Sequence, residues 1–145
     1  MKTKKLGLFA LLATGLIALA WCNNTVEVSP NTEAEIDLWE STVYSMEDRQ
    51  AAIDAIEDVF NNVWEVKPEL HKIYYTSDEE SAEELSYVQE YNENYTESIL
   101  FKSDFHSPIS SEEAGAFNPD EEYTWWMWIL AREEWWEWDV VSRWY

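Results

Sequence analysis

The amino-acid sequence predicts an α+β domain in which helices come first and an antiparallel sheet follows. Two observations carry this prediction. Apolar residues recur at three- and four-residue steps after Ser45, the period of an amphipathic helix. From Thr96 onward the period falls to two, which is typical of a strand with two different faces. Helices and strands that are segregated along the chain indicate the α+β class.

The first helix is predicted to begin after Ser45. Ser45 is followed by an acidic residue at Asp48, which is the spacing of a capping box and places a negative charge at the positive end of the helix dipole. Pro68 ends the helical pattern. The apolar positions in between are Ala52, Ile53, Ile56, Val59, Phe60, Val63 and Trp64.

A short strand and a second helix are predicted next. Residues 70–76 are rich in residues that favour strands. Ser77 followed by Glu80 repeats the capping pattern of the first helix. A second apolar stripe then runs through Ala82, Leu85, Val88 and Tyr91.

Three strands are predicted in the rest of the chain. The first covers residues 96–105, and a loop with two prolines and a glycine covers residues 106–121. Two further strands, 122–132 and 135–144, are joined by a tight turn at Glu133 and Glu134. Strict alternation places Tyr123, Trp125, Met127 and Ile129 on one face, and Trp126, Trp128 and Leu130 on the other. In the returning strand it groups Trp136, Trp138, Val140 and Trp144.

The first 21 residues have the pattern of a signal peptide. Three lysines precede an apolar run at residues 6–20, which is shorter than the ~20 residues that a membrane-spanning helix needs. Cleavage after Ala20 would release a freely secreted chain. The favoured alternative is a lipobox over residues 19–22, which makes the protein an extracytoplasmic lipoprotein anchored to the membrane through Cys22.

Residues 22–44 are predicted to form a flexible tether with a short ordered piece near residues 36–39, and residues 45–145 a single domain. Cys22 is the one cysteine, so no intramolecular disulfide forms.

The composition is strongly acidic. The chain has 9 Lys and Arg against 30 Asp and Glu, a net charge of −21. Without the three lysines of the signal peptide, six basic residues remain and the net charge is −24. Such a field repels phosphate backbones, which argues against nucleic-acid binding. The acidic residues are interpreted as a solubilising surface that also suits a cationic partner. The 16% aromatic content argues against disorder.

The C-terminal half carries a distinctive set of residues: Ser103-Asp104-Phe105, Asn118-Pro119, Tyr123, Trp126, Trp128-Ile129-Leu130, Arg132, Trp138-Asp139-Val140 and Tyr145. This set resembles an uncharacterised family of small exported bacterial domains, and the resemblance covers about residues 45–145. That family is similar to the NTF2-like (cystatin-like) folds, so the resemblance implies a curved sheet that wraps an N-terminal helix. It implies no activity, because none is established for the family.

The strand at residues 122–132 is apolar on both faces, although an antiparallel sheet with one wet face alternates apolar and polar residues. One face must cover the helix, and the other needs the tether, a second subunit or a ligand. The predicted ligand site is a concave aromatic face for a sugar, a peptide or a hydrophobic small molecule. Self-packing in the core and a homodimer interface are the alternatives. The predicted site residues are Tyr123, Trp126, Trp128 and Trp138.

Catalysis is a further alternative. Asp104 and His106 lie two residues apart on one strand, and an NTF2-like enzyme would place a general acid or base such as Asp104 inside its curved sheet. His71 has no partner nearby in sequence. Acidic residues near Asn118 do not form a twelve-residue calcium loop, and no metal site or cofactor is predicted. The sequence therefore favours a binding domain for an unknown ligand or protein.

Overall fold

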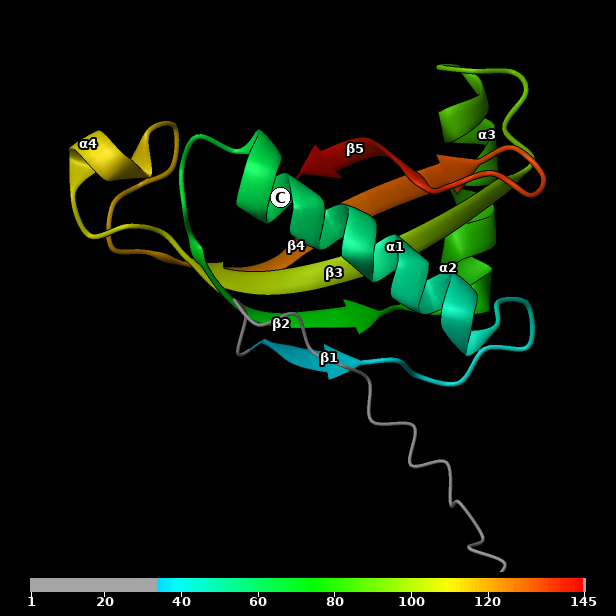
Figure 1. Cartoon of the computed structure of the whole chain (residues 1–145), viewed down its shortest axis with the longest axis horizontal. Helices are drawn as coiled ribbons and strands as arrows, with labels where there is room; N and C mark the ends of the chain where they lie inside the picture. The colour runs from blue at the N-terminus through cyan, green and yellow to red at the C-terminus, as the bar shows by residue number, and fades with distance from the viewer. Residues whose placement is uncertain (1–33, 145) are drawn as a thin grey trace, which may run out of the picture.

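The computed structural model describes residues 34–144, which form a five-stranded mixed sheet with helices on both faces (Figure 1). The strands lie in the sheet in chain order, β1 to β5, and the α+β class is confirmed. β1 is parallel to β2, and every other neighbouring pair is antiparallel. The strands are β1 Glu35–Asp37, β2 Glu69–Tyr75, β3 Glu97–His106, β4 Glu122–Arg132 and β5 Asp139–Trp144.

Residues 34–44 belong to the folded part of the chain, whereas the sequence places them in a flexible tether with a short ordered piece near residues 36–39, which β1 overlaps. β1 pairs with β2, and the buried Tyr44 donates a hydrogen bond to the carbonyl oxygen of Ser98 at 2.5 Å. The Asp78 carboxylate accepts the backbone N–H of Thr42 at 2.8 Å. A three-residue strand is too short to show a period. The signal peptide, Cys22 and the rest of the tether lie outside the described residues.

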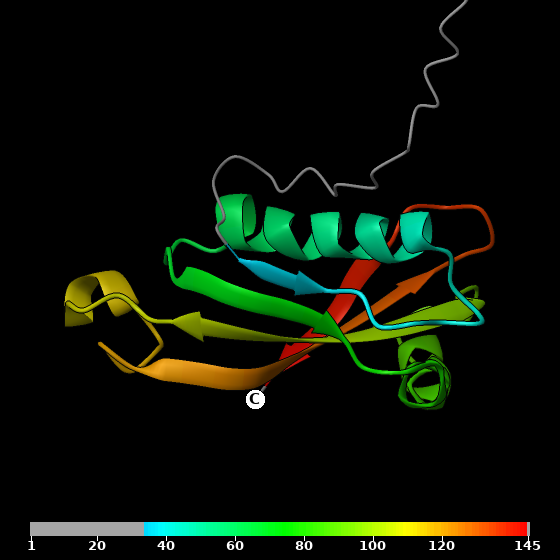
Figure 2. The same cartoon turned by 90° about the horizontal axis from the view of Figure 1, so that it is seen from below.

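Helix α1, Met46–Asp58, lies across one face of the sheet (Figure 2). The predicted capping box is confirmed: the Ser45 hydroxyl accepts the N–H of Asp48, and the Asp48 carboxylate accepts the N–H of Ser45. A turn of π-helix, η1 (Val59–Val63), extends α1. The apolar side of α1 and the sheet enclose the main core. This core contains Ala52, Ile53, Ile56, Ile73, Phe101, Phe105, Trp128 and Leu130.

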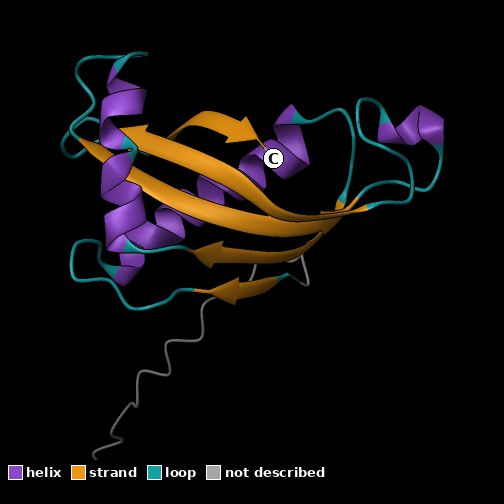
Figure 3. Cartoon of the chain, turned by 180° about the vertical axis from the view of Figure 1, so that it is seen from behind, coloured by secondary structure: helices purple, strands orange, loops and turns teal. Residues whose placement is uncertain are grey.

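The opposite face carries two short helices, α2 (Asp78–Glu83) and α3 (Leu85–Gln89), where one helix was expected. They cover only one end of that face, and the rest of it is free of any helix (Figure 3). Between the helices and the sheet lies a second core of Val88, Tyr95, Leu100, Ile129 and Ala131. None of the helices in residues 34–144 has the length and apolar composition needed to cross a membrane.

β4 has the predicted bounds, but a β-bulge changes which residues share a face. Ser103 pairs with Trp126 and Phe105 with Tyr123, so Asp104 alone lies opposite two residues of β4. One of the two is Trp125, whose φ is 60°. Tyr123 and Trp126 therefore lie on the same side as α1, and the strict alternation predicted for them is wrong.

The returning strand is also shorter than expected, because residues 135–138 belong to the turn and β5 begins at Asp139. A register shift between Ile129 and Leu130 leaves Val141 unpaired and places Trp144, which pairs with Met127, on the face opposite Val140, so the predicted grouping of Val140 and Trp144 on one face is wrong. The loop before β4 contains a single helical turn, α4 (Ser111–Ala114), and projects beyond the end of the sheet (Figure 1).

Candidate functional site

Two of the four predicted binding residues are core residues. Trp128 is 0% exposed and Trp138 is 6% exposed. The Trp128 indole N–H donates to the Ser103 hydroxyl at 2.8 Å, and that of Trp138 donates to the carbonyl oxygen of Asp48 at 3.0 Å. The predicted ligand-binding role of Trp128 is corrected accordingly, because its indole is fully enclosed between the sheet and α1 and lines none of the clefts described below. Trp138 is mainly a core residue that packs against α1, where burying an aromatic ring stabilises the fold.

Tyr123 and Trp126 are half-buried in a cluster of rings on the α1 side of the sheet. Phe117, from the loop before β4, lies 5.2 Å from Tyr123 and 5.7 Å from Trp126, measured between ring centroids. The Tyr123 hydroxyl also accepts the backbone N–H of Asn118 at 2.8 Å. The protein's own rings thus occupy the region that the sequence assigned to a ligand. A binding role for Tyr123 and Trp126 stays a prediction.

Asp104 and His106 have separate partners. The Asp104 carboxylate accepts the backbone N–H of Trp125 at 2.9 Å and so holds the bulge. The two ring nitrogens of His106 lie 3.1 Å from Glu122 and 3.0 Å from Asp120. His71, which had no partner in the sequence, lies 2.9 Å from the other oxygen of Glu122.

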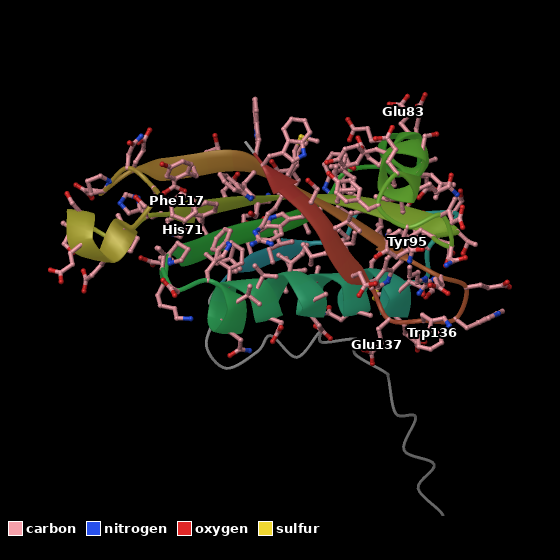
Figure 4. All side chains as sticks on the ribbon, turned by 90° about the horizontal axis from the view of Figure 1, so that it is seen from above. His71, Glu83, Tyr95, Phe117, Trp136 and Glu137 are labelled. Carbon is pink, nitrogen blue, oxygen red and sulfur yellow. The ribbon has the colours of Figure 1, made fainter. Side chains whose placement is uncertain are left out.

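Two strongly exposed tryptophans lie next to each other in the turn between β4 and β5, which we call the indole turn (residues 133–138). Trp135 is 91% exposed and Trp136 is 71% exposed. Figure 4 shows Trp136 and Glu137 projecting from the turn, at the far end of the molecule from Phe117. Trp135 has φ 70°, a left-handed conformation that costs a bulky residue roughly 1–2 kcal/mol. Sequence reasoning missed this site because it continued the strand through both residues.

Two clefts flank the indole turn, with volumes of about 550 and 640 Å³. A third, of about 440 Å³, is lined by residues of the turn itself and by Asp139. Both exposed indoles line all three clefts. The first cleft is completed by Asp48, Thr96, Glu97, Arg132 and Glu134. The second lies between the turn and α1 and includes Ala51, Asp54, Ala55, Asp58, Glu137, Trp138, Asp139 and Val140. These volumes are in the range of small-molecule sites.

A half-buried network beneath the turn fixes its position. The Arg132 guanidinium lies 2.8 Å from Asp48 and 2.5 Å from Glu97, and its central carbon lies 4.3 Å from the ring of Trp138. The Ser45 hydroxyl and Arg132 lower the pKa of Asp48. On the β5 side, the Tyr95 hydroxyl donates to Asp139 at 3.1 Å. The indoles therefore project from a turn that is held at both ends.

The clefts have a strongly negative lining. Arg132 is the single basic residue among the lining residues, and two carboxylates already compensate its charge. The carboxylates that remain belong to Asp54, Asp58, Glu133, Glu134, Glu137 and Asp139. Carboxylates and indole faces together suit a ligand with an apolar and positively charged surface.

A second exposed surface lies on the side of the sheet that α2 and α3 leave uncovered. We call it the bare face, and it includes Trp125 and Trp144, which are 71% and 48% exposed. Met127 pairs with both Trp144 and Lys102 across the strands. The remaining members, Lys72, Tyr74 and Asp104, lie on β2 and β3.

Within residues 34–144 no group of His, Cys, Asp or Glu side chains is arranged to hold a metal ion. No family model, no curated protein and no solved structure matches the chain.

Proposed function

We propose that the protein is an extracytoplasmic binding domain that holds a small ligand at the indole turn. The observation that carries the proposal is the exposure of Trp135 and Trp136, side by side and between three clefts. Large indoles on a fixed turn are poorly placed for stability and well placed for contact with a ligand. The turn thus replaces the concave sheet face as the ligand site.

Export and anchoring are part of the same proposal. The basic start and apolar run of residues 1–21 support export, and Cys22 supports a lipid anchor, with free secretion as the alternative. We also propose an NTF2-like fold. The packing of the antiparallel strands β2 to β5 on α1 supports it, and the parallel strand β1 is an addition to that arrangement.

Nuclear magnetic resonance of the indole N–H groups tests the proposal. The purified protein, labelled with ¹⁵N, is titrated with a panel of neutral saccharides, short peptides and small organic cations. We expect at least one class to shift the Trp135 and Trp136 signals in a saturable way and to leave the Trp125 signal in place. If every class leaves the two turn signals unmoved, there is no ligand site at the indole turn.

Matched variants assign the effect to the turn. Trp135→Ala and Trp136→Ala should each weaken binding at least tenfold. Trp125→Ala removes an indole as exposed as that of Trp136 and should leave the affinity unchanged. Loss of binding in all three variants would point to a general aromatic effect and contradict the proposed site.

Assembly through the bare face is the second candidate function, favoured by the exposure of Trp125 and Trp144. Lys72 lies 3.2 Å from Glu35, and Lys102 gives this face a further positive charge, so two copies could meet here with less repulsion than elsewhere. Sedimentation velocity tests it. A dimer that dissociates in a Trp125→Ala, Trp144→Ala double variant would support assembly, and a wild-type monomer at high concentration would contradict it.

Catalysis by Asp104 has no support from the geometry. Asp104 lines none of the three clefts at the indole turn, and its carboxylate holds the backbone of Trp125.

A further inference from the structure

The geometry points to a small organic cation as the ligand of the indole turn. The cation would carry an alkylated ammonium or a guanidinium group that lies against Trp135 and Trp136. This inference rests on the proposed binding function and adds the chemical class of the ligand. Its support comes from the charge of the cleft lining, from the aromatic surface, and from a cation that the protein already holds just beneath the turn.

Charge selects against anions at this place. The six uncompensated carboxylates that line the clefts add to the negative field of a chain whose net charge is −21. A field of one sign concentrates ions of the opposite sign near the surface and accelerates their association. A neutral sugar gains nothing from this field, and a phosphate or carboxylate compound is repelled. Positive charge is therefore the first property of the ligand.

The indoles select among cations. The face of a Trp ring attracts a cation, and indole is the best of the aromatic side chains in this respect. The attraction competes with hydration, so a large and weakly hydrated group such as trimethylammonium or guanidinium is better suited than a compact ammonium or a metal ion. A contact of this kind strengthens binding about 2- to 30-fold, depending on its exposure to water. Trp135 and Trp136 provide two such surfaces at neighbouring positions.

The structure contains an internal example of the same combination. The Arg132 guanidinium lies over the face of Trp138 and between the carboxylates of Asp48 and Glu97. This arrangement shares its lining residues with the clefts at the indole turn. The exposed layer repeats its chemistry, with Trp135 and Trp136 as the ring faces and Glu134 and Glu137 as neighbouring carboxylates. No basic side chain of the described lining residues lies with this exposed group of rings and carboxylates other than Arg132, which already has its own partners, so a ligand would supply the cation.

A pair of isosteric probes separates charge from shape. Choline and 3,3-dimethyl-1-butanol have nearly the same size and the same hydroxyl group, and they differ in the charge on the central atom. We expect choline to shift the Trp135 and Trp136 indole signals in a saturable way, with at least tenfold higher affinity than the neutral isostere. Sodium chloride at the same concentration serves as the control for ionic strength.

Carboxylate variants test the electrostatic part. Glu134→Gln combined with Glu137→Gln should lower the affinity for choline about tenfold. The matched control combines Glu83→Gln with Glu112→Gln, which removes the same charge from exposed positions in α2 and α4. The control should lower the affinity less than twofold. An equal loss in both double variants would mean that only the total charge matters, and it would overturn the inference of a local cation site.

The outcomes distinguish this inference from the proposed function. Equal binding of the two isosteres would contradict the inference that the ligand is a cation, and so would a neutral saccharide that shifts the turn signals when choline does not. In both cases the proposed binding site at the indole turn would still hold. If no compound of the panel shifts the turn signals, both the inference and the proposed function fail.

Discussion

At the scale of single residues, a left-handed backbone conformation accompanies the exposure of two tryptophans of this protein. Trp128 continues a regular strand and is 0% exposed beneath α1. Trp125 and Trp135 have φ values of 60° and 70°, and their indoles are 71% and 91% exposed. A β-branched or bulky residue with positive φ is uncommon, and such strain persists only where other interactions maintain it.

Replacement of Trp135 by glycine tests whether this residue serves stability. Glycine relieves about 1–2 kcal/mol of left-handed strain and loses about 0.5–1 kcal/mol through its greater freedom in the unfolded chain. Almost no packing is lost, because the indole is 91% exposed. We therefore expect Trp135→Gly to leave the free energy of unfolding unchanged or to raise it by up to about 1.5 kcal/mol.

Urea unfolding monitored by circular dichroism measures this effect. Trp136→Gly is the matched control, since Trp136 is exposed but not left-handed, and it should be destabilising by about 0.5–1 kcal/mol. A Trp135→Gly variant that is more than about 1 kcal/mol less stable than the wild type would show that the indole stabilises the turn.

The face of the sheet on which a side chain lies could be predicted from the sequence only where the strand is regular. The alternation correctly placed Trp128 and Leu130 on one face of β4 and Ile129 on the other. It failed at Tyr123, because the bulge at Trp125 inserts one residue. A bulge with a left-handed residue can be recognised in a sequence when that residue is a glycine, as in the G1 type. Here the position is a tryptophan, and the Asp104 carboxylate that holds it comes from a different strand.

At the scale of elements, the helices and strands whose own residues carry a capping pattern or a strand-favouring run could be predicted from the sequence. The start of α1 follows from Ser45 and Asp48, whose side chains and backbone N–H groups pair as the capping box requires. β4 follows from a long run of residues that favour strands. The three-residue β1 has no such signal, and it is ordered by its pairing with β2. The turn at residues 135–138 was missed because the composition of these residues is that of a strand.

The ends of β2, β3 and β4 are linked by histidines and carboxylates, and this link depends on pH. His106 in β3 lies between Asp120 and Glu122, and hydrogen bonds first to Asp120 and then to Glu122 raise its pKa above the ordinary value. When the ring is protonated, both nitrogens donate to carboxylates. When it is neutral, one nitrogen lone pair faces a carboxylate oxygen. The raised pKa means that the stabilisation is complete below the unfolded pKa of about 6.5 and is lost as the pH rises through the folded pKa.

A comparison of melting temperatures between pH 5.5 and pH 8.5 measures this link. At pH 5.5 the wild type should have a higher melting temperature than His106→Asn, and this difference in melting temperature should shrink as the pH rises. Asp120→Asn removes the strongest partner and should bring the pKa of His106, followed by its proton resonance, back toward the ordinary value. A difference between wild type and His106→Asn that grows with increasing pH would contradict the assigned sign.

At the scale of the whole molecule, hydrophobic packing opposes electrostatic repulsion. Two cores, one on each face of the sheet, hold together a chain that carries 30 acidic and 9 basic residues. The ion pairs of Arg132 and Lys72 offset only a small part of the repulsion, since Lys72 and its partner Glu35 are partly exposed to water. The net charge, which is readable from the sequence alone, therefore determines how the stability responds to salt.

We expect sodium chloride to stabilise the protein. Raising the salt concentration from about 10 mM to about 0.15 M shortens the screening length from roughly 30 Å to roughly 8 Å, so repulsion between distant carboxylates is reduced more than attraction within contacting pairs. The melting temperature should rise by about 4 °C, which corresponds to about 1 kcal/mol for a domain of this size. Differential scanning calorimetry measures the shift. In Arg132→Met, where an attractive pair is absent, the rise should be at least as large; a melting temperature that falls with salt in the wild type would mean that local ion pairs outweigh the repulsion across the molecule.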